Sequence, residues 1–147
     1  MIGPPQITEV IDAALGRRPL DLVLRGAKVV NVFTRSVREM DIGVLGNRIV
    51  LVGKIGAGAI TAETEILDCS GRHVVPGFID PHFHIGGSQL TVPELARALL
   101  KRGTTTIVSD LQEIYSYSGM PGVRYILDEQ DHSPVRDLGH EDDADAA

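Results

Sequence analysis

The sequence has no tryptophan, a single cysteine and only 4% aromatic residues. No apolar stretch reaches the roughly 18 residues of a membrane-spanning helix, and the N-terminus lacks a basic region followed by an apolar core. The sequence therefore predicts neither a membrane span nor a secretory signal. The one cysteine, Cys69, has no partner for an internal disulfide, which is typical of a protein in a reducing cytoplasm.

A basic surface is also missing. The net charge is −6, and residues 128–147 hold eight acidic residues against one basic residue, so this segment carries −7 and the rest of the chain +1. No cluster of Lys and Arg with interleaved aromatic residues occurs, so we do not expect a nucleic-acid partner. Residues 130–147 have little apolar content, and we expect an acidic, disordered tail there.

The chain is too short to close a large barrel. Its 147 residues are a normal length for one domain, whereas an eight-stranded α/β barrel typically needs about 250 residues. The 43% apolar and 23% charged residues are typical of a soluble, globular protein.

The first half predicts one helix followed by a β-rich module. Residues 7–15 have apolar side chains at helical spacing, with Gly16 as the C-terminal stop, and residues 1–19 form this helix and a linker. Gly46-Asn47 is a favourable tight-turn pair between two expected strands. The strands expected in the module, which spans residues 20–73, cover 20–24, 28–33, 38–45, 48–52, 66–69 and 72–75.

The pattern changes after residue 73 to strand, helix, strand and helix. Val74-Val75 and Phe78-Ile79 form a nearly continuous apolar run, which predicts a strand buried on both faces. A helix follows, with Thr91 and Glu94 as a capping box and Gly103 at its end. Residues 104–109 predict the next strand, and residues 122–127 open a second helix. Parallel pairing of the two strands is the default for such a unit.

The stretch V-V-P-G-F-I-D-P-H-F-H-I, residues 74–85, contains a histidine pair. Successive strand side chains alternate between faces, so His82 and His84 are expected to point the same way. Two imidazoles on one face are a common half-site for a transition metal. The alternative is a pair of histidines on a solvated strand face, and Asp80, two residues before His82, has no assigned role.

Acidic residues follow the second strand of this unit. In parallel α/β folds, reactive groups gather at the C-terminal ends of the strands. His82 and His84 end one strand, and Asp110, Gln112 and Glu113 follow the next, so both groups are expected at one rim. Asp110 and Glu113 are candidate catalytic residues, although carboxylates after a strand are also routine helix caps.

Four sequence elements together resemble a known family: the β-rich module, P-G-F-I-D-P-H-F-H, L-T-x-x-E-x-A-R-A-x-L-x-x-G-T-T-T, and D-L-Q-E-I followed by G-x-R-Y-x-L-x-E. Over residues 20–129 the chain resembles the N-terminal part of the metal-dependent amidohydrolases, and adenine deaminase in particular. The resemblance implies an α/β fold: a partial (β/α)₈ TIM barrel over residues 74–129, preceded by a small sandwich-like β module. It also implies a divalent metal ion, manganese, iron or zinc, held partly by His82 and His84.

The activity that this resemblance implies is hydrolytic deamination of adenine, or a similar nucleobase, by metal-activated water. Two departures bear on the substrate: Gly86-Gly87-Ser88 stands where the family has a glutamate and two serines, and Gln112 stands where its D-P-H-E-I element has histidine. The family's later ligand-bearing strands do not occur in the chain, so we expect a truncated form whose activity depends on a homo-oligomer or a completing chain. The alternatives are another amidohydrolase branch, such as a cyclic amidase, and a non-catalytic interaction module. His132 and His140 match no family element and are expected to be solvated.

Overall fold

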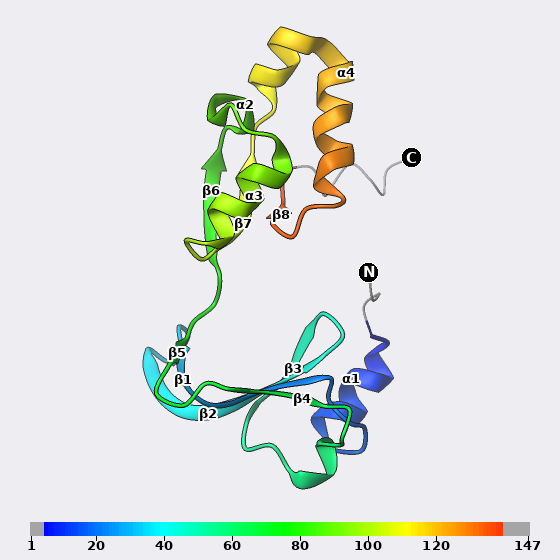
Figure 1. Cartoon of the computed structure of the whole chain (residues 1–147), viewed down its shortest axis with the longest axis vertical. Coiled ribbons are helices and arrows are strands. Elements are labelled where there is room, and N and C mark those ends of the chain that lie inside the picture. Colours follow the sequence, from blue (N-terminus) through cyan, green and yellow to red (C-terminus); the bar gives the residue numbers. More distant parts are fainter. Residues whose placement is uncertain (1–4, 140–147) are drawn as a thin grey trace. The chain divides into compact units, whose positions relative to one another are not determined.

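The computed structural model describes residues 5–139, and the chain divides into two compact units, Met1–Pro76 and Gly77–Ala147. Figure 1 shows the helices and strands of both units. The structure combines β-sheets with α-helices, so the α/β class is confirmed. The packing divides the chain between Pro76 and Gly77, slightly later than the boundary at residue 73 that the sequence suggested.

The first unit opens with helix α1, Ile7–Ala14, as predicted. The backbone N–H of Gln6 donates to Glu9 Oε2 at 2.9 Å, and this bond, helped by Arg18, holds the pKa of the Glu9 carboxyl below its ordinary value. Gly16 follows the helix with φ of 71°, the left-handed conformation that ends many helices. The predicted stop at Gly16 is therefore confirmed.

Five strands form the sheet of the first unit, in the order β3-β2-β1-β4 with β5 also paired to β1. Their bounds are β1 Leu22–Asn31, β2 Ser36–Leu45, β3 Arg48–Gly53, β4 Glu65–Asp68 and β5 His73–Val74, and a short 3₁₀ helix, η1, spans Ala57–Ala59. The core of this unit lies between the sheet, α1 and η1. Its buried members are Ala13, Leu20, Val23, Leu45 and Ala59.

One prediction for this sheet is wrong, because residues 20–24 and 28–33 do not form two separate strands. They belong to the single strand β1, whose register against β2 shifts between Leu24 and Ala27. Gly26 has φ of 66° at this bulge, and its N–H donates to Asp41 Oδ1 at 2.8 Å. A glycine with positive φ can therefore mark a bulge inside a strand as well as its end.

The tight turn at Gly46-Asn47 is confirmed. It joins β2 to β3, Gly46 has φ of 56°, and its N–H donates to Asp21 Oδ2 at 2.6 Å. The turn is thus held by a carboxylate from a distant part of the unit as well as by its own conformation.

The second unit contains a three-stranded sheet in the order β6-β7-β8 with α-helices between the strands. The elements are β6 Phe78–Phe83, α2 Ile85–Ser88, α3 Val92–Leu100, β7 Thr104–Ser109, α4 Gln112–Gln130 and β8 Arg136–Asp137. Both pairings are parallel, so the predicted strand-helix-strand unit is confirmed. A core that includes Leu95 and Ala96 of α3 packs with Ile107 of β7 and Ile126 of α4.

The expected strand buried on both faces is wrong. Val74 belongs to β5 of the first unit, and β6 begins only at Phe78. Phe78 and Ile79 are 59% and 62% exposed. Strand β6 is also an edge strand, which pairs only with β7 among residues 5–139. An apolar run indicates a strand but does not show how many of its faces are covered.

Two details of the helices also differ from expectation. Thr91 is the N-cap of α3, but its side chain makes no cap hydrogen bond. The Glu94 side chain forms a 3.1 Å ion pair with Arg97. Helix α4 begins at Gln112 rather than near Gly122, and it bends at Gly119, where φ is 61° and ψ −160°, as Figure 1 shows. Pro121, two residues later, accounts for the break, since proline cannot donate the helical hydrogen bond.

The segment after α4 is not disordered as far as the structure describes it. Val135 is 5% exposed, and Arg136–Asp137 forms strand β8 beside β7. The prediction of a disordered tail is therefore wrong for residues 130–139. Although the segment is mostly polar, Val135 is buried in the core and the Asp137 carboxylate is hydrogen-bonded to β7 and α4. The rest of the predicted tail, residues 140–147, lies outside the described residues. In the described part of the chain, no helix combines the length and apolar character needed to cross a membrane.

Candidate metal centre

The histidine pair lies where strand β6 passes into helix α2. His82 is the penultimate strand residue, and His84 is the extended N-cap of α2, with φ of −110° and ψ of 100°. Because the backbone stays extended through this point, residues two apart project to the same side. The two Nε2 atoms lie 2.8 Å apart, and the ring centroids are separated by 4.8 Å. The two imidazoles therefore point the same way.

The backbone before the pair is irregular. The register of β6 against β7 shifts between Asp80 and Phe83, and Pro81 within this shift has no N–H to donate. The N–H of His82 instead donates to Asp80 Oδ1 at 3.2 Å. Asp80 thus supports the backbone from which the first histidine projects.

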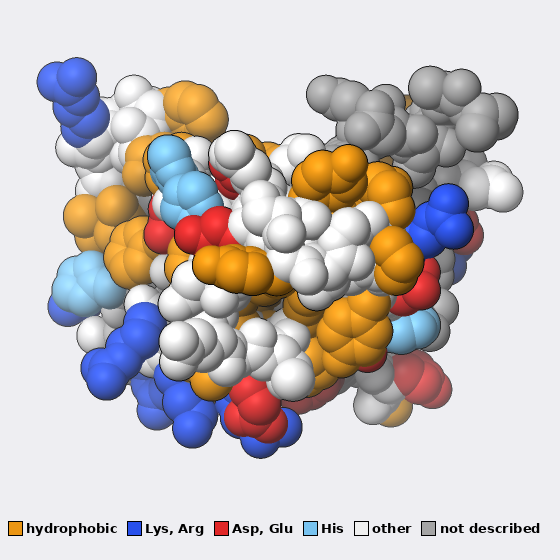
Figure 2. All heavy atoms as spheres, turned by 90° about the horizontal axis from the view of Figure 1, so that it is seen from above, with side chains coloured by type: hydrophobic (Ala, Val, Ile, Leu, Met, Phe, Trp, Pro, Cys, Tyr) orange, Lys and Arg blue, Asp and Glu red, His pale blue; other side chains and the backbone are white. Residues whose placement is uncertain are grey.

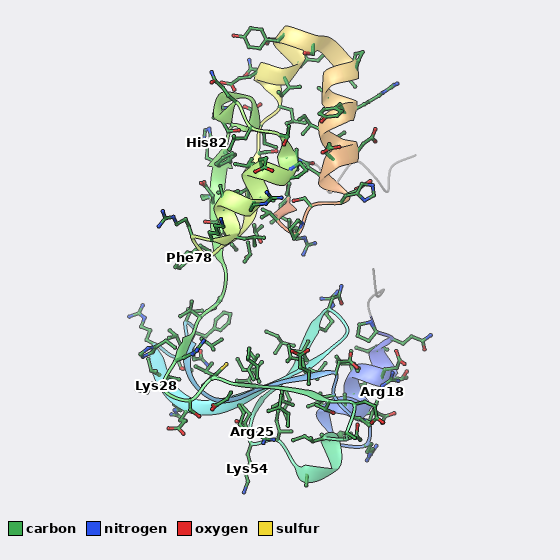
Figure 3. All side chains as sticks on the ribbon, viewed as in Figure 1. Arg18, Arg25, Lys28, Lys54, Phe78 and His82 are labelled. Atoms are coloured by element: carbon green, nitrogen blue, oxygen red, sulfur yellow. The ribbon has the colours of Figure 1, made fainter. Side chains whose placement is uncertain are left out.

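Both histidines are open to solvent. Figure 2 shows touching histidine side chains at the surface with acidic side chains next to them. Figure 3 shows Phe78 and His82 on β6, with Phe78 at the start of the strand and His82 near its end. A ligand could reach both Nε2 atoms without any rearrangement of the core.

The donor set fits part of a divalent metal site. Two imidazole nitrogens at about 2.0–2.1 Å from a tetrahedral zinc would lie roughly 3.4 Å apart, so the observed pair needs only a small side-chain rotation. Imidazole also suits iron, and carboxylates suit manganese, so a site that combines these histidines with carboxylates fits either ion. Among residues 5–139, however, no group of three His, Cys, Asp or Glu side chains is placed to hold a metal ion. The pair is a half-site in this part of the chain.

Asp110 follows the C-terminal end of β7, and its groups are engaged locally. Its backbone N–H donates to the carbonyl of Phe83 at 3.0 Å, which joins the ends of β6 and β7. Its Oδ1 accepts the N–H of Gln112 at 2.7 Å, at the start of α4. Asp110 thus bonds the first N–H of α4 from the position before the cap, whereas the N-cap itself is Leu111 and has no side-chain cap hydrogen bond.

Glu113 lies in the first turn of α4, with its carboxylate over the two glycines of α2. A Cβ atom added to Gly86 would lie 3.0 Å from Glu113 Oε2, and one added to Gly87 would lie 3.4 Å from it. The same position at Gly87 is 3.7 Å from the Cβ of His84. Glu113 is thus brought to the segment that carries the second histidine, whereas Gln112 is exposed.

In the sequence, Gly86-Gly87 stands out only as a departure from a family pattern. In the structure these residues leave the space that Glu113 fills. In the sequence, this contact is indicated only by two adjacent residues without side chains, and such a pair does not show which residue will pack against it. Of the remaining histidines, His132 is exposed after α4, and His140 lies outside the described residues.

Comparisons with known proteins point to one group of enzymes. No family model matches the sequence. An adenine deaminase from Moorella thermoacetica is 43% identical over 128 residues, which cover 87% of this chain and 21% of that protein. An adenine deaminase from a Ruegeria species is 42% identical over 133 residues, which cover 90% of this chain and 22% of that protein.

Among solved structures, a D-aminoacylase mutant in complex with copper chloride is similar with a TM-score of 0.53 and 30% identity, over 63% of this chain and 19% of that one. The chain spans about a fifth of the length of the curated relatives that it matches. The resemblance is thereby confirmed: over nearly nine-tenths of its own length, this chain is related in sequence to the adenine deaminases of the amidohydrolase superfamily.

Proposed function

We propose that this chain supplies the histidine pair of a divalent metal site in an adenine deaminase-like hydrolase, which converts adenine and water to hypoxanthine and ammonia. The observation that carries the proposal is the 2.8 Å approach of the His82 and His84 Nε2 atoms in a chain 36–43% identical to adenine deaminases. The substrate would be adenine or a similar nucleobase.

The proposed architecture is the beginning of a (β/α)₈ barrel. The support is the run β6-α3-β7-α4-β8, in which each strand is parallel to the next along the sheet. The β-rich first unit would be the sandwich-like module beside that barrel. In such barrels the catalytic groups lie at the C-terminal ends of the strands, which is where His82, His84 and Asp110 are found.

Each residue of the site has a proposed role. His82 and His84 would hold manganese, iron or zinc, and Asp80 orients the backbone of His82 through its 3.2 Å bond. A bound divalent cation supplies the activation of a water molecule by lowering its pKa. Glu113 is the candidate proton carrier, because its carboxylate lies beside the His84 segment and its oxygen can accept and return a proton. Asp110 positions the start of α4 next to this site.

A complete catalytic zinc site usually has three protein ligands and one open position. The third ligand would come from another part of a longer chain, from a second copy or from a completing chain. The cytoplasm is the proposed compartment, since the single cysteine, Cys69, is buried and unpaired.

A second candidate function is that of a module without activity of its own. It is favoured by the lack of a third metal ligand among residues 5–139. A third candidate, another amidohydrolase branch, is favoured by the similarity to a D-aminoacylase structure.

Metal binding tests the site. Titration of the full chain with Zn²⁺ or Mn²⁺ is expected to show weak binding that is lost in both His82→Ala and His84→Ala. His132→Ala is the matched control, since His132 is also exposed but lies away from the pair. Unchanged metal content in both site variants would refute the assignment of these two ligands.

The products formed from three substrates separate the candidates, because deamination of adenine releases ammonia, whereas opening of a hydantoin ring or deacylation of an N-acyl-D-amino acid produces a new carboxylate and no ammonia. The metal-loaded chain is incubated with adenine, with a hydantoin and with an N-acyl-D-amino acid. Release from adenine alone, reduced in Glu113→Gln, supports the deaminase assignment. Hydrolysis of either other substrate, detected as a new carboxylate, supports a different branch. Metal binding without any turnover supports a module without activity of its own, which is also the result expected of a deaminase half-site that still needs its third ligand.

A further inference from the structure

The last described segment, residues 135–139, lies along the edge of β7 opposite to β6. Its strand β8 pairs with β7 through Thr106 with Arg136 and Ile107 with Asp137. One further backbone bond follows, from the N–H of Leu138 to the carbonyl of Ile107 at 3.0 Å. The backbone pairing is therefore very short, and the segment depends on its side chains for most of its attachment.

The first side-chain anchor is the carboxylate of Asp137, which accepts hydrogen bonds from four donors. The N–H of Ser109 and the N–H of Gly139 each donate to Oδ1 at 2.9 Å. Gln130 Nε2 donates to Oδ2 at 2.6 Å, and the Ser109 hydroxyl also donates to Oδ2. Ser109 and Gln130 belong to β7 and α4, so a site for one carboxylate exists on elements outside the segment.

The second anchor is Val135, which is 5% exposed and belongs to the core of the second unit. A small cavity beside it is lined by apolar side chains of α2, α3 and β7 together with Val135 and Asp137. The edge of β7 thus accepts an extended segment with a branched apolar residue two positions before a carboxylate.

The connection from α4 to this segment is made of local contacts. The N–H of Ser133 donates to the carbonyl of Gln130 at 2.9 Å, and the N–H of Val135 donates to Ser133 Oγ at 3.1 Å. Asp131, His132 and Pro134 are exposed. Opening this connection would break few bonds, and a short hinge beside a separable element favours exchange of that element between copies.

We infer that the edge of β7 is a strand-acceptor site, and that its occupant in a dimer is the same segment of a second copy of this chain. The four bonds to the Asp137 carboxylate and the core contacts of the Val135 side chain are preserved in such an exchange, because donor and acceptor are identical in the two copies, whereas the bond from the Val135 N–H to Ser133 Oγ belongs to the hinge. Only the hinge at residues 131–134 changes conformation. The exchanged dimer is therefore favoured by rising protein concentration.

Cysteine trapping tests this inference in the full chain. All variants carry Cys69→Ala, which removes the only native cysteine. Copies with Thr106→Cys are mixed with copies carrying Arg136→Cys, since these two positions are paired Cα partners in β7 and β8. Under mild oxidation we expect a disulfide-linked heterodimer on a non-reducing gel, and its initial rate of formation rises with concentration.

Two controls make the result decisive. A single chain with both Thr106→Cys and Arg136→Cys is expected to form an internal disulfide at low concentration, which verifies the pairing. Adding Asp137→Asn to the Arg136→Cys copy removes the anchoring charge and is expected to raise the trapping rate severalfold.

Three outcomes would overturn the inference. Internal disulfide without any heterodimer from the mixture would show that the segment stays in its own chain. Failure of the double variant to form the internal disulfide would show that β8 does not lie on β7. An equal yield when Thr105→Cys replaces Thr106→Cys would show non-specific collision, because Thr105 is not a Cα partner of β8.

Discussion

Single residues determine what the candidate site can bind. The direction of His82 and His84 could be predicted from sequence, because the two-residue period of an extended chain places them on one side and the Nε2 atoms indeed lie 2.8 Å apart. The contact between Glu113 and the glycines of α2 could not be predicted, since it depends on how α4 packs beside α2. The exposure of Phe78 could not be predicted either, because the sequence of an apolar run is the same whether its side chains are covered or exposed.

Gly77 is a residue at which any side chain should be harmful. A Cβ atom there would lie 2.1 Å from Thr105 Oγ1 and 2.8 Å from Thr105 Cβ. We expect Gly77→Ala to destabilise the second unit by about 1–3 kcal/mol, the usual range for an overpacked site. Urea unfolding measures the change in the free energy of unfolding, and hydrogen exchange of the β6 and β7 amides shows where the structure is loosened.

The control for this substitution is Gly56→Ala, because nothing lies within 4 Å of a Cβ at Gly56. Combining Gly77→Ala with Thr105→Ala should recover part of the loss by removing the methyl and hydroxyl groups that clash. Equal stability of Gly77→Ala and Gly56→Ala would contradict the close approach of Gly77 to β7.

Whole elements were predicted well where their signals are local. The bounds of β7 follow from its β-branched run, and the parallel pairing of β6 with β7 follows from the helical segment between them, which forms α2 and α3. The errors occur where a distant contact decides the outcome. Gly26 marks a bulge because Asp41 bonds its N–H, and β8 exists because Ser109 and Gln130 bond Asp137.

The bulge in β1 should be sensitive to a side chain at Gly26. This residue has φ of 66°, and a Cβ atom would lie 3.0 Å from Ser70 Oγ. Gly16 has a similar φ of 71° with nothing within 4 Å. We expect Gly16→Ala to lower the free energy of unfolding by about 1 kcal/mol through backbone strain alone. Gly26→Ala should lower it more, because the new Cβ would also crowd Ser70 Oγ.

Chemical denaturation of the first unit by urea compares the two variants. Gly26→Ala in a Ser70→Ala background should approach the smaller loss of Gly16→Ala, since the crowding oxygen is gone. A larger loss for Gly16→Ala than for Gly26→Ala would show that the Ser70 contact is unimportant.

Residues 5–139 contain two hydrophobic cores that share no residue. One includes Leu20 and Val23 of the first unit, and the other includes Leu95 and Ile107 of the second. Two separate cores predict that the chain does not unfold in a single cooperative step. The sequence did indicate a change of architecture near residue 73, because the alternation of short strands gives way there to strand-helix-strand spacing.

Calorimetry of matched core variants tests this prediction. Leu20→Ala and Leu95→Ala each remove a side chain that is at most 5% exposed and should each cost about 2–5 kcal/mol. The first is expected to lower only one melting transition and the second only the other. A single transition that both variants shift equally would show that the two cores unfold together.

The division at Pro76 also has a meaning for synthesis on the ribosome. Every strand of the first sheet is translated before Gly77, so that unit can fold while the second is still being made. Within the second unit, β7 is complete at Ser109, whereas its neighbour β8 begins at Arg136. Translation proceeds at roughly 5–20 residues per second, so the edge of β7 stays unpaired for a few seconds until β8 of the same chain has been translated. Nascent chains on one messenger are close together during that interval, and each carries the same vacant edge.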